Sequence, residues 1–256
     1  MFSVCVIGTG NVAYHFSKII LENKNLKLSQ VIGRKKELDF EFKLNIDYNN
    51  NLNSIADADL YLICVSDSTI KEISKKIKDK SNSVIAHCSG STNINVLKNH
   101  KNYGVIYPLQ TLTKKKNIDF YKTPLLIESN NRNSFKKINF FSKSICNQVI
   151  KCNSDERAYV HVSAVFCNNF VNYMNFISQK ILESKKIDPK IILPLVSETA
   201  SKLVQLKPIE AQTGPAIRKD MVTIKKHLHL LKNSDFFDLY KILTNSILKN
   251  TDELQE

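Results

Sequence analysis

Short hydrophobic runs and helical spacings alternate along the first 150 residues. Runs rich in β-branched and aromatic residues predict buried strands at residues 3–7, 26–32, 60–65, 83–87, 103–107, 124–128 and 147–151. Apolar residues three and four apart predict the helices between them, at residues 12–21, 69–78 and 132–144. Strands that alternate with helices are typical of the α/β class, here a doubly wound and mostly parallel sheet.

The pattern changes to helices alone near residue 151. Helices are predicted at residues 156–183, 189–205, 215–231 and 235–249. Asp188 and Pro189 form a typical helix start, with the acid as N-cap and the proline in the first turn. We therefore expect two domains, an α/β domain over residues 1–151 and a smaller all-helical domain over residues 152–256.

The helix expected at residues 156–183 is apolar on nearly all sides, which predicts that it is buried. One stripe of it is nevertheless polar, since His161, Asn168 and Asn172 are spaced by seven and four residues. Buried imidazole and amide groups need hydrogen-bond partners. A ligand in a cleft between the two domains would supply them. Hydrogen bonds between helices, or a dimer interface, are the alternatives.

The first predicted strand runs directly into the turn Gly8-Thr9-Gly10-Asn11-Val12-Ala13. In this G-x-G-x-x-A pattern the first glycine permits a tight turn and the second lets the backbone approach a pyrophosphate. The small last residue lets the helix pack closely against the strand. The free N–H groups at the helix start favour phosphate. This position between strand and helix predicts a dinucleotide site at residues 8–12 rather than a chance glycine turn.

The end of the second predicted strand bears on the kind of dinucleotide. A cofactor with a free ribose 2′-hydroxyl calls for an acidic residue here, about 20 residues beyond the glycines. Glu37 and Asp39 come too late, and Arg34 and Lys35 stand in that place instead. Arg34 can pair with a 2′-phosphate, which favours NADP over NAD. A solvated arginine in a lysine-rich chain is the alternative.

Small polar residues follow three more predicted strands, as expected where an open α/β sheet binds its ligands. They are, in chain order, Val65, Ser66 and Asp67, then His87 and Ser89, and last Gln110 and Thr111. We expect the first group and Ser89 to contact the cofactor. His87 is expected beside the nicotinamide, and the last group is expected to contact the substrate.

The run Thr213-Gly214-Pro215-Ala216-Ile217-Arg218 predicts another helix start, with Thr213 as the cap and Pro215 in the first turn. Arg218 would add charge to an already positive helix end, which is unfavourable unless an anion is bound there. A carboxylate or phosphate of the substrate fits this requirement. An ion pair between Arg218 and Glu210 is the alternative.

Composition excludes several classes of protein. The net charge of +13 comes from lysines scattered along an Asn-rich chain without an arginine-rich patch, so we expect no nucleic-acid partner. No apolar run approaches the ~20 residues of a membrane span, and the first strand leaves no room for a signal peptide. The six cysteines form no C-x-x-C pair. We expect reduced thiols, no metal site and a cytoplasmic protein.

Six motifs occur in a characteristic order, namely V-C-V-I-G-T-G-N-V-A, V-S-D, H-C-S-G-S, Y-P-L-Q-T, H-V-S-A-V-F-C-N-N-F and T-G-P-A-I-R-K-D. With them the chain resembles bacterial Rossmann-like proteins whose C-terminal half is a helical domain of unknown function, usually described as NADP oxidoreductases. More distantly it is similar to pyrroline-5-carboxylate reductase, deazaflavin-dependent NADP reductase and the 6-phosphogluconate and β-hydroxyacid dehydrogenases. The resemblance implies the fold and the dinucleotide cofactor.

The chain departs from the β-hydroxyacid enzymes at one position. Those enzymes carry a catalytic lysine, and an asparagine one turn later, on the helix between the domains. Here the same helix offers His161 and then Val165. We expect His161 to act as the general acid and Asn168 to orient the substrate, with His87 as a further catalytic candidate. A proton from elsewhere, or loss of that reaction, are the alternatives.

Together these features predict an NADP(H)-dependent oxidoreductase of small, anionic keto, imino, hydroxy or amino compounds. The substrate would contact Gln110, Thr111, Asn172 and Arg218. A redox sensor that binds a dinucleotide without catalysis and acts through a protein partner is the alternative. Because so small a helical domain cannot cover so apolar a helix, we also expect a homodimer formed through the C-terminal helices.

Overall fold

The computed structural model of the chain describes residues 1–43, 46–79 and 82–250. Its contacts divide the chain into two compact units, Met1–Asn169 and Phe170–Glu256. The boundary predicted between residues 151 and 152 falls inside the first unit, where the last strand gives way to a helix. It marks the change in pattern correctly, and as a domain boundary it stays a prediction.

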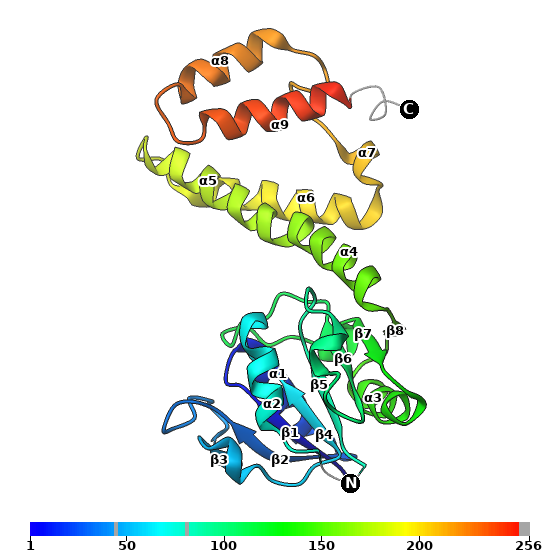
Figure 1. The fold of residues 1–256 in the computed structure, drawn as a ribbon. Helices are drawn as coiled ribbons and strands as arrows, with labels where there is room; N and C mark the ends of the chain where they lie inside the picture. Colours follow the sequence, from blue (N-terminus) through cyan, green and yellow to red (C-terminus); the bar gives the residue numbers. More distant parts are fainter. Residues whose placement is uncertain (44–45, 80–81, 251–256) are drawn as a thin grey trace. The chain divides into compact units, whose positions relative to one another are not determined.

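A twisted sheet organises the first unit (Figure 1). The strands are β1 (Phe2–Ile7), β2 (Leu26–Ile32), β3 (Tyr48–Asn49), β4 (Leu60–Ile63), β5 (Val84–His87), β6 (Tyr103–Pro108), β7 (Leu125–Ser129) and β8 (Val149–Lys151). Among the described residues their order is β3-β2-β1-β4-β5-β6-β7-β8, and β6–β7 is the one antiparallel pair. This is the doubly wound strand order of a Rossmann fold, which confirms the predicted fold class.

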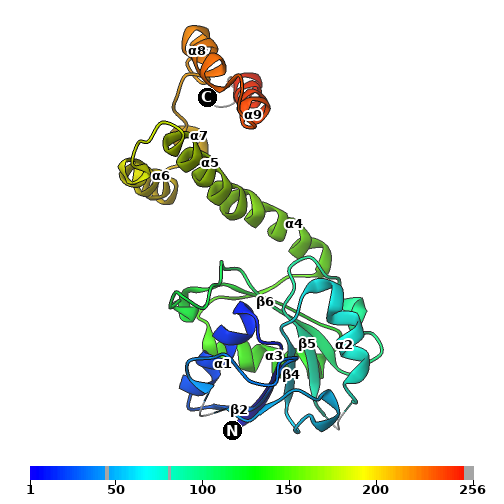
Figure 2. The same cartoon turned by 90° about the vertical axis from the view of Figure 1, so that its left-hand side faces the viewer.

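Helices cover both faces of the sheet. In this unit they are α1 (Asn11–Glu22), α2 (Ile70–Lys76), α3 (Arg132–Ile145) and α4 (Ser154–Ala164), with the short turns η2 (Leu52–Ser54), η3 (Asp67–Thr69), η4 (Ile94–Leu97) and η5 (Phe120–Lys122). Alternate strand residues point to opposite faces. Val4 and Val6 therefore pack with α1 and α3, whereas Cys5 and Ile7 pack with α2. Figure 2 shows α2 across the sheet from α1.

The register of the strands brings four loops to one edge of the sheet. Ile7 is paired with Ile32 on one side and with Ile63 on the other, and Ile63 is paired with His87. All four residues end parallel strands. The loops after β1, β2, β4 and β5 therefore begin side by side at the carboxyl edge, where open α/β sheets bind ligands.

The second unit is helical. It begins at the last residue of the π-helical segment η6 (Val165–Phe170). The elements that follow are α5 (Val171–Glu183), η7 (Pro189–Ile192), α6 (Leu193–Gln205), α7 (Pro208–Ala211), α8 (Met221–Leu231) and α9 (Phe237–Lys249). Asp188 accepts the N–H of Lys190 at 2.9 Å, as predicted for a cap. Helices α8 and α9 are joined by a hydrogen bond of 2.8 Å between His227 Nδ1 and the Tyr240 hydroxyl.

One predicted helix starts six residues later than expected. Residues 214–219 form turns, and α8 begins at Met221. The physical reason lies in the backbone, since Gly214 (φ +113°) and Lys219 (φ +52°) both have left-handed conformations that interrupt a helix. Asp220 is the actual cap and accepts the N–H of Thr223 at 3.0 Å. Arg218 therefore precedes the helix and does not lie in its first turn, and the anion expected beside it stays a prediction.

The long helix forms as predicted but is not buried by its own chain. It runs without a break through α4, η6 and α5. The side chains of Val162, Val171 and Tyr173 are each nearly half exposed, at 48%, 47% and 48%. This agrees with the expectation that so small a helical domain cannot cover the helix, and burial of the helix in a homodimer stays a prediction.

Two chemical expectations can be compared with the structure directly. No disulfide joins the six cysteines in the described part of the chain, and five of them are buried while Cys167 is exposed. Within the described ranges, no helix has both the length and the hydropathy needed to traverse a bilayer.

Candidate functional site

The turn between β1 and α1 depends on two glycines. Gly8 has φ +129°, and a Cβ there would lie 2.2 Å from the carbonyl oxygen of Cys64. Only glycine fits, because both the backbone conformation and the close approach to the end of β4 exclude a side chain. Gly10 is the N-cap of α1 and has nothing within 4 Å of the position of a Cβ.

Open space therefore lies against the positive end of α1. The first turn of this helix has no acidic residue and its cap makes no side-chain hydrogen bond. The first N–H groups of a helix have no partner within the helix, so the described turn leaves them for an anion. The shape and charge of residues 8–12 fit the pyrophosphate of a dinucleotide.

The end of β2 lies against the same turn. A Cβ on Gly33 would be 2.6 Å from Thr9 Cγ2 and 2.5 Å from the Tyr48 hydroxyl. Arg34 follows directly and is exposed. Asp39 pairs with Lys35 at 3.6 Å and with Lys114 at 2.8 Å, and the hydrogen bond from Lys114 lowers the pKa of Asp39.

Arg34 has no ion-pair partner in the described part of the chain. An exposed guanidinium beside the glycine turn is suited to a phosphate on the adenosine side of a nucleotide. Asp39, by contrast, already has ion-pair partners, because Lys35 and Lys114 neutralise its carboxylate.

The loops after β4 and β5 are tied to each other. Val65 is half-buried, and Ser66 and Asp67 are exposed. Asp67 accepts a hydrogen bond of 2.6 Å from the Ser91 hydroxyl. Ser89 lies inside the second loop, where its hydroxyl donates to Thr92 Oγ1 at 2.9 Å. The predicted cofactor residues of these loops thus lie at the carboxyl edge, although Ser89 itself is buried.

His87 is completely buried under this loop. Its Nδ1 accepts the N–H of Ser89 at 3.2 Å. Burial, and then the nearby Arg157 guanidinium, lower the pKa of His87 to about 3, so the ring stays neutral. His87 does not line the pocket described next. Its hydrogen bond to Ser89 supports the loop after β5, and its complete burial does not favour contact with a ligand.

A pocket of about 470 Å³ opens beside the glycine turn, entirely within the first unit. It is lined by the start of α1, the residue after β5, the end of β6 with its loop, and the long helix. The lining residues are Asn11, Val12, Cys88, Tyr107, Pro108, Leu109, Gln110, Thr111, Leu112, His161, Ala164, Val165, Cys167, Asn168 and Asn169. The structure therefore gathers Asn11, Gln110, Thr111, His161 and Asn168, which the sequence predicted separately.

The pocket wall from the long helix includes the π-helical turn. Cys167, Asn168 and Asn169 belong to η6 and line the pocket. A π-turn inserts an extra residue per turn and is frequent at functional sites. It widens the helix here, and Asn168 Nδ2 donates to Asn169 Oδ1 at 3.4 Å. Three consecutive residues of this turn therefore line the pocket.

Tyr107 is a site residue that the sequence analysis missed. Its hydroxyl lies 3.1 Å from His161 Nδ1, and the two rings meet edge to face at 5.9 Å. Burial, and then the charge of Asp67, raise the pKa of Tyr107. The available signal was its place at the end of a predicted strand, as the first residue of the Y-P-L-Q-T motif, from which only Gln110 and Thr111 were selected.

Two predicted substrate residues lie in the second unit and outside the pocket lining. Asn172 borders a different hollow, between α5, η7 and α6. Arg218 is exposed in the turn before α8. Their contact with a substrate stays a prediction.

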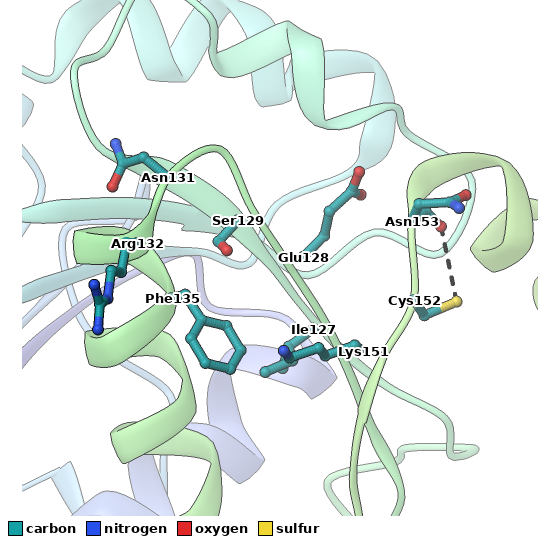
Figure 3. Close-up of a pocket in the computed structure, with 9 residues that line it drawn as sticks. All are labelled: Ile127, Glu128, Ser129, Asn131, Arg132, Phe135, Lys151, Cys152 and Asn153. Carbon is teal, nitrogen blue, oxygen red and sulfur yellow. Dashed lines mark hydrogen bonds between the residues drawn. The ribbon is translucent and has the colours of Figure 1, made fainter.

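Another hollow of about 360 Å³ lies at the edge formed by β7, β8 and α3 (Figure 3). Lys151 lies over the Phe135 ring there, with Nζ 4.3 Å from its centre. Glu128 borders this hollow, but its carboxylate binds Arg157 at 2.5 Å. None of the predicted site residues lines it. No group of three His, Cys, Asp or Glu side chains that suits a metal occurs among the described residues.

Comparisons with known proteins agree with this architecture. Residues 123–247 match the domain of unknown function DUF2520. A candidate NADP oxidoreductase from Bacteroides fragilis is 30% identical over 97% of this chain and 98% of its own, with a TM-score of 0.88. A search of the curated proteins returned no match.

Two more distant structures share the fold. Pyrroline carboxylate reductase from Plasmodium falciparum, with NADP bound, is 10% identical over 100% of this chain and 98% of its own, with a TM-score of 0.61. An imine reductase variant from Myxococcus stipitatus, in complex with NAD⁺, is 12% identical over 100% of both chains, with a TM-score of 0.57. The 30% identity over nearly the full length is what decides the relationship. The chain belongs to the family of Rossmann-fold proteins that carry the C-terminal domain DUF2520.

Proposed function

We propose that this protein is an NADP(H)-dependent oxidoreductase acting on a small keto, imino, hydroxy or amino compound. The observation that carries the proposal is the continuity of the pocket with the glycine turn. Asn11 and Val12, at the positive end of α1, line the same pocket as His161. The family member described as a candidate NADP oxidoreductase supports the same class.

The nucleotide would be held by residues 8–12 at its pyrophosphate and by Val65, Ser66, Asp67 and Ser89 along the strand ends. It would supply or accept the hydride when bound. Arg34 favours NADP, because its guanidinium is exposed beside the turn and has no described ion-pair partner. The NADP-bound pyrroline carboxylate reductase and the NAD⁺-bound imine reductase share the fold, so fold alone does not choose between the cofactors.

His161 would supply the proton to a developing alkoxide or amine, since it lines the pocket and an imidazole can carry and transfer a proton. Asn168, Gln110 and Thr111 line the pocket with it and would orient the substrate. An anionic substrate group bound by Arg218 and Asn172 remains part of the proposal without support from the pocket lining.

We also propose that two copies of the chain associate through the C-terminal helices. Apolar side chains on α6 and α8 are largely exposed, with Val204 at 88% and Leu230 at 77%. Exposed apolar surface of this extent is typical of an interface.

The test is a thermal shift assay with NAD⁺, NADP⁺ and their reduced forms on the wild type, Arg34→Ala and Lys36→Ala. We expect NADP(H) to raise the melting temperature more than NAD(H). Arg34→Ala should weaken NADP(H) binding by ~10-fold or more, the value of a charge-assisted hydrogen bond. Lys36→Ala removes a neighbouring exposed cation and should change little. Absence of any shift would refute the proposal.

Turnover separates this enzyme from a redox sensor. NADPH oxidation should be observed with at least one member of a panel of small imines and keto acids. It should fall in His161→Ala while the nucleotide-dependent thermal shift is kept. Tight nucleotide binding without turnover across the panel would favour the sensor instead.

A further inference from the structure

Tyr107 and His161 form a contact that the proposed proton transfer does not by itself require. Tyr107 is on β6 and His161 is on α4, so the contact joins the sheet edge to the long helix. The hydroxyl oxygen and Nδ1 are 3.1 Å apart, and the ring planes are inclined by 76°. Both side chains line the pocket beside the glycine turn.

Gly90 holds the two rings together from the loop after β5. A Cβ on this residue would lie 2.6 Å from His161 Nδ1 and 2.8 Å from Tyr107 Cζ. A side chain there would force one ring to move. Glycine at this position therefore leaves the space in which the two rings meet.

The donor of this hydrogen bond can be identified from the protons and acceptors that the two groups have. The raised pKa of Tyr107 keeps its hydroxyl protonated at neutral pH. Among the described residues, His161 Nδ1 is the partner of this hydroxyl. If the phenol donates to the Nδ1 lone pair, its O–H has an acceptor, whereas an Nδ1–H donor would leave that O–H without one among the described residues. In the first arrangement a neutral imidazole, which carries one N–H, has its proton on Nε2.

We propose that Tyr107 is a positioning residue that holds the His161 ring in its Nε2–H tautomer and so presents a hydrogen-bond donor to the pocket. The fitting ligand group is a lone-pair acceptor, namely a carbonyl oxygen or an imine nitrogen. In the imidazolium form both nitrogens carry protons, so Nε2–H is present in both charge states of the ring. The catalytic meaning of this donor rests on the proposed function, whereas the tautomer itself does not.

The tautomer can be measured on the whole protein without any ligand. Two-dimensional NMR of protein labelled with ¹⁵N-histidine distinguishes protonated from unprotonated ring nitrogens, and His161→Gln assigns the signals of this ring. In the neutral ring we expect a protonated Nε2 and an unprotonated Nδ1. In Tyr107→Phe we expect both ¹⁵N shifts to move towards each other, because the two tautomers then exchange.

Tyr103→Phe is the matched control, since it removes a phenol from the same strand and should leave the pattern unchanged. An Nδ1 that carries the proton in the wild type would overturn the inference, and this result does not depend on Tyr107→Phe folding. Unaltered shifts in folded Tyr107→Phe would overturn it as well. Failure of the proposed function would instead appear as a lack of nucleotide binding in the thermal shift assay, with the tautomer unaffected.

Discussion

Two glycines of one turn have different tasks at the residue scale. Gly8 is required by the fold, because φ +129° and the carbonyl of Cys64 at 2.2 Å from a Cβ exclude a side chain. Gly10 faces open space at the helix start and has an ordinary φ of −77°. A side chain at Gly10 therefore changes what the turn can bind, whereas one at Gly8 changes whether the turn can form.

Gly10→Asp is expected to separate stability from binding. A carboxylate at this N-cap accepts hydrogen bonds from the free N–H groups and interacts favourably with the positive end of the helix dipole. The free energy of unfolding should therefore rise by about 0.5–1 kcal/mol or stay unchanged. The same charge repels a pyrophosphate, so the thermal shift caused by NADPH should disappear. Urea denaturation and thermal shift on one preparation measure both quantities.

Gly8→Ala is the counterpart of that variant. Backbone strain alone should lower the free energy of unfolding by about 1–3 kcal/mol, and the contact with Cys64 adds to the loss. If Gly8→Ala were as stable as the wild type while Gly10→Asp unfolded, the assignment of these two tasks would be wrong.

At the scale of elements, α4 is fixed to the sheet by a buried ionic cluster. Arg157 is completely enclosed, binds Glu128 of β7 at 2.5 Å and donates to the carbonyl of Thr92 at 2.7 Å. This cluster orients the helix that carries His161. The same guanidinium lies near His87 and contributes, after burial, to its lowered pKa of about 3.

The protein should become less stable in mild acid because of His87. Its imidazole stays neutral in the folded state down to about pH 3, while in the unfolded chain it takes up a proton near pH 6.5. The stability it contributes is therefore complete above pH 6.5 and falls as the pH decreases, by about 1.4 kcal/mol per pH unit. Urea denaturation between pH 6.5 and 5 measures this slope above the range in which carboxylates titrate.

His87→Asn should flatten this slope, because the amide oxygen can still accept the N–H of Ser89 but does not titrate. His229→Asn changes an exposed histidine and is expected to leave the slope as in the wild type. Equal slopes in the wild type and His87→Asn would show that the buried imidazole is not the group responsible.

At the scale of the whole molecule, the two units differ in how completely they bury their apolar side chains. The strands and helices of the first unit bury two apolar clusters, one on each face of the sheet. The helices of the second unit leave large apolar side chains exposed, including Leu195 at 66% and Val204 at 88%. Such a surface is costly in water, and a second copy of the chain would reduce the cost.

We expect the wild type to sediment as a dimer at micromolar concentration in analytical ultracentrifugation. Val204→Asp should shift it towards the monomer by placing a charge in the proposed interface, with the far-ultraviolet circular dichroism unchanged. Tyr121→Asp, at an exposed aromatic residue of the first unit, serves as the control and should remain dimeric. A monomeric wild type would refute the proposed association.

The sequence by itself determined the strands other than the short β3, most of the helices, the glycine turn and the cap at Asp188. These features depend on residues close together in the chain, where periodicity and turn chemistry act directly. It also selected several residues of one pocket, because parallel strands bring their carboxyl ends to a common edge.

Only the tertiary structure decided that Tyr107 meets His161, 54 residues away, and that His87 is enclosed and neutral. It also showed that left-handed residues delay α8 until Asp220 can cap it. Each of these outcomes depends on which distant groups pack together or on backbone conformations that several residue types can adopt. A hydrophobicity pattern records the preference of each residue for water, and it contains no information on which partner satisfies that preference.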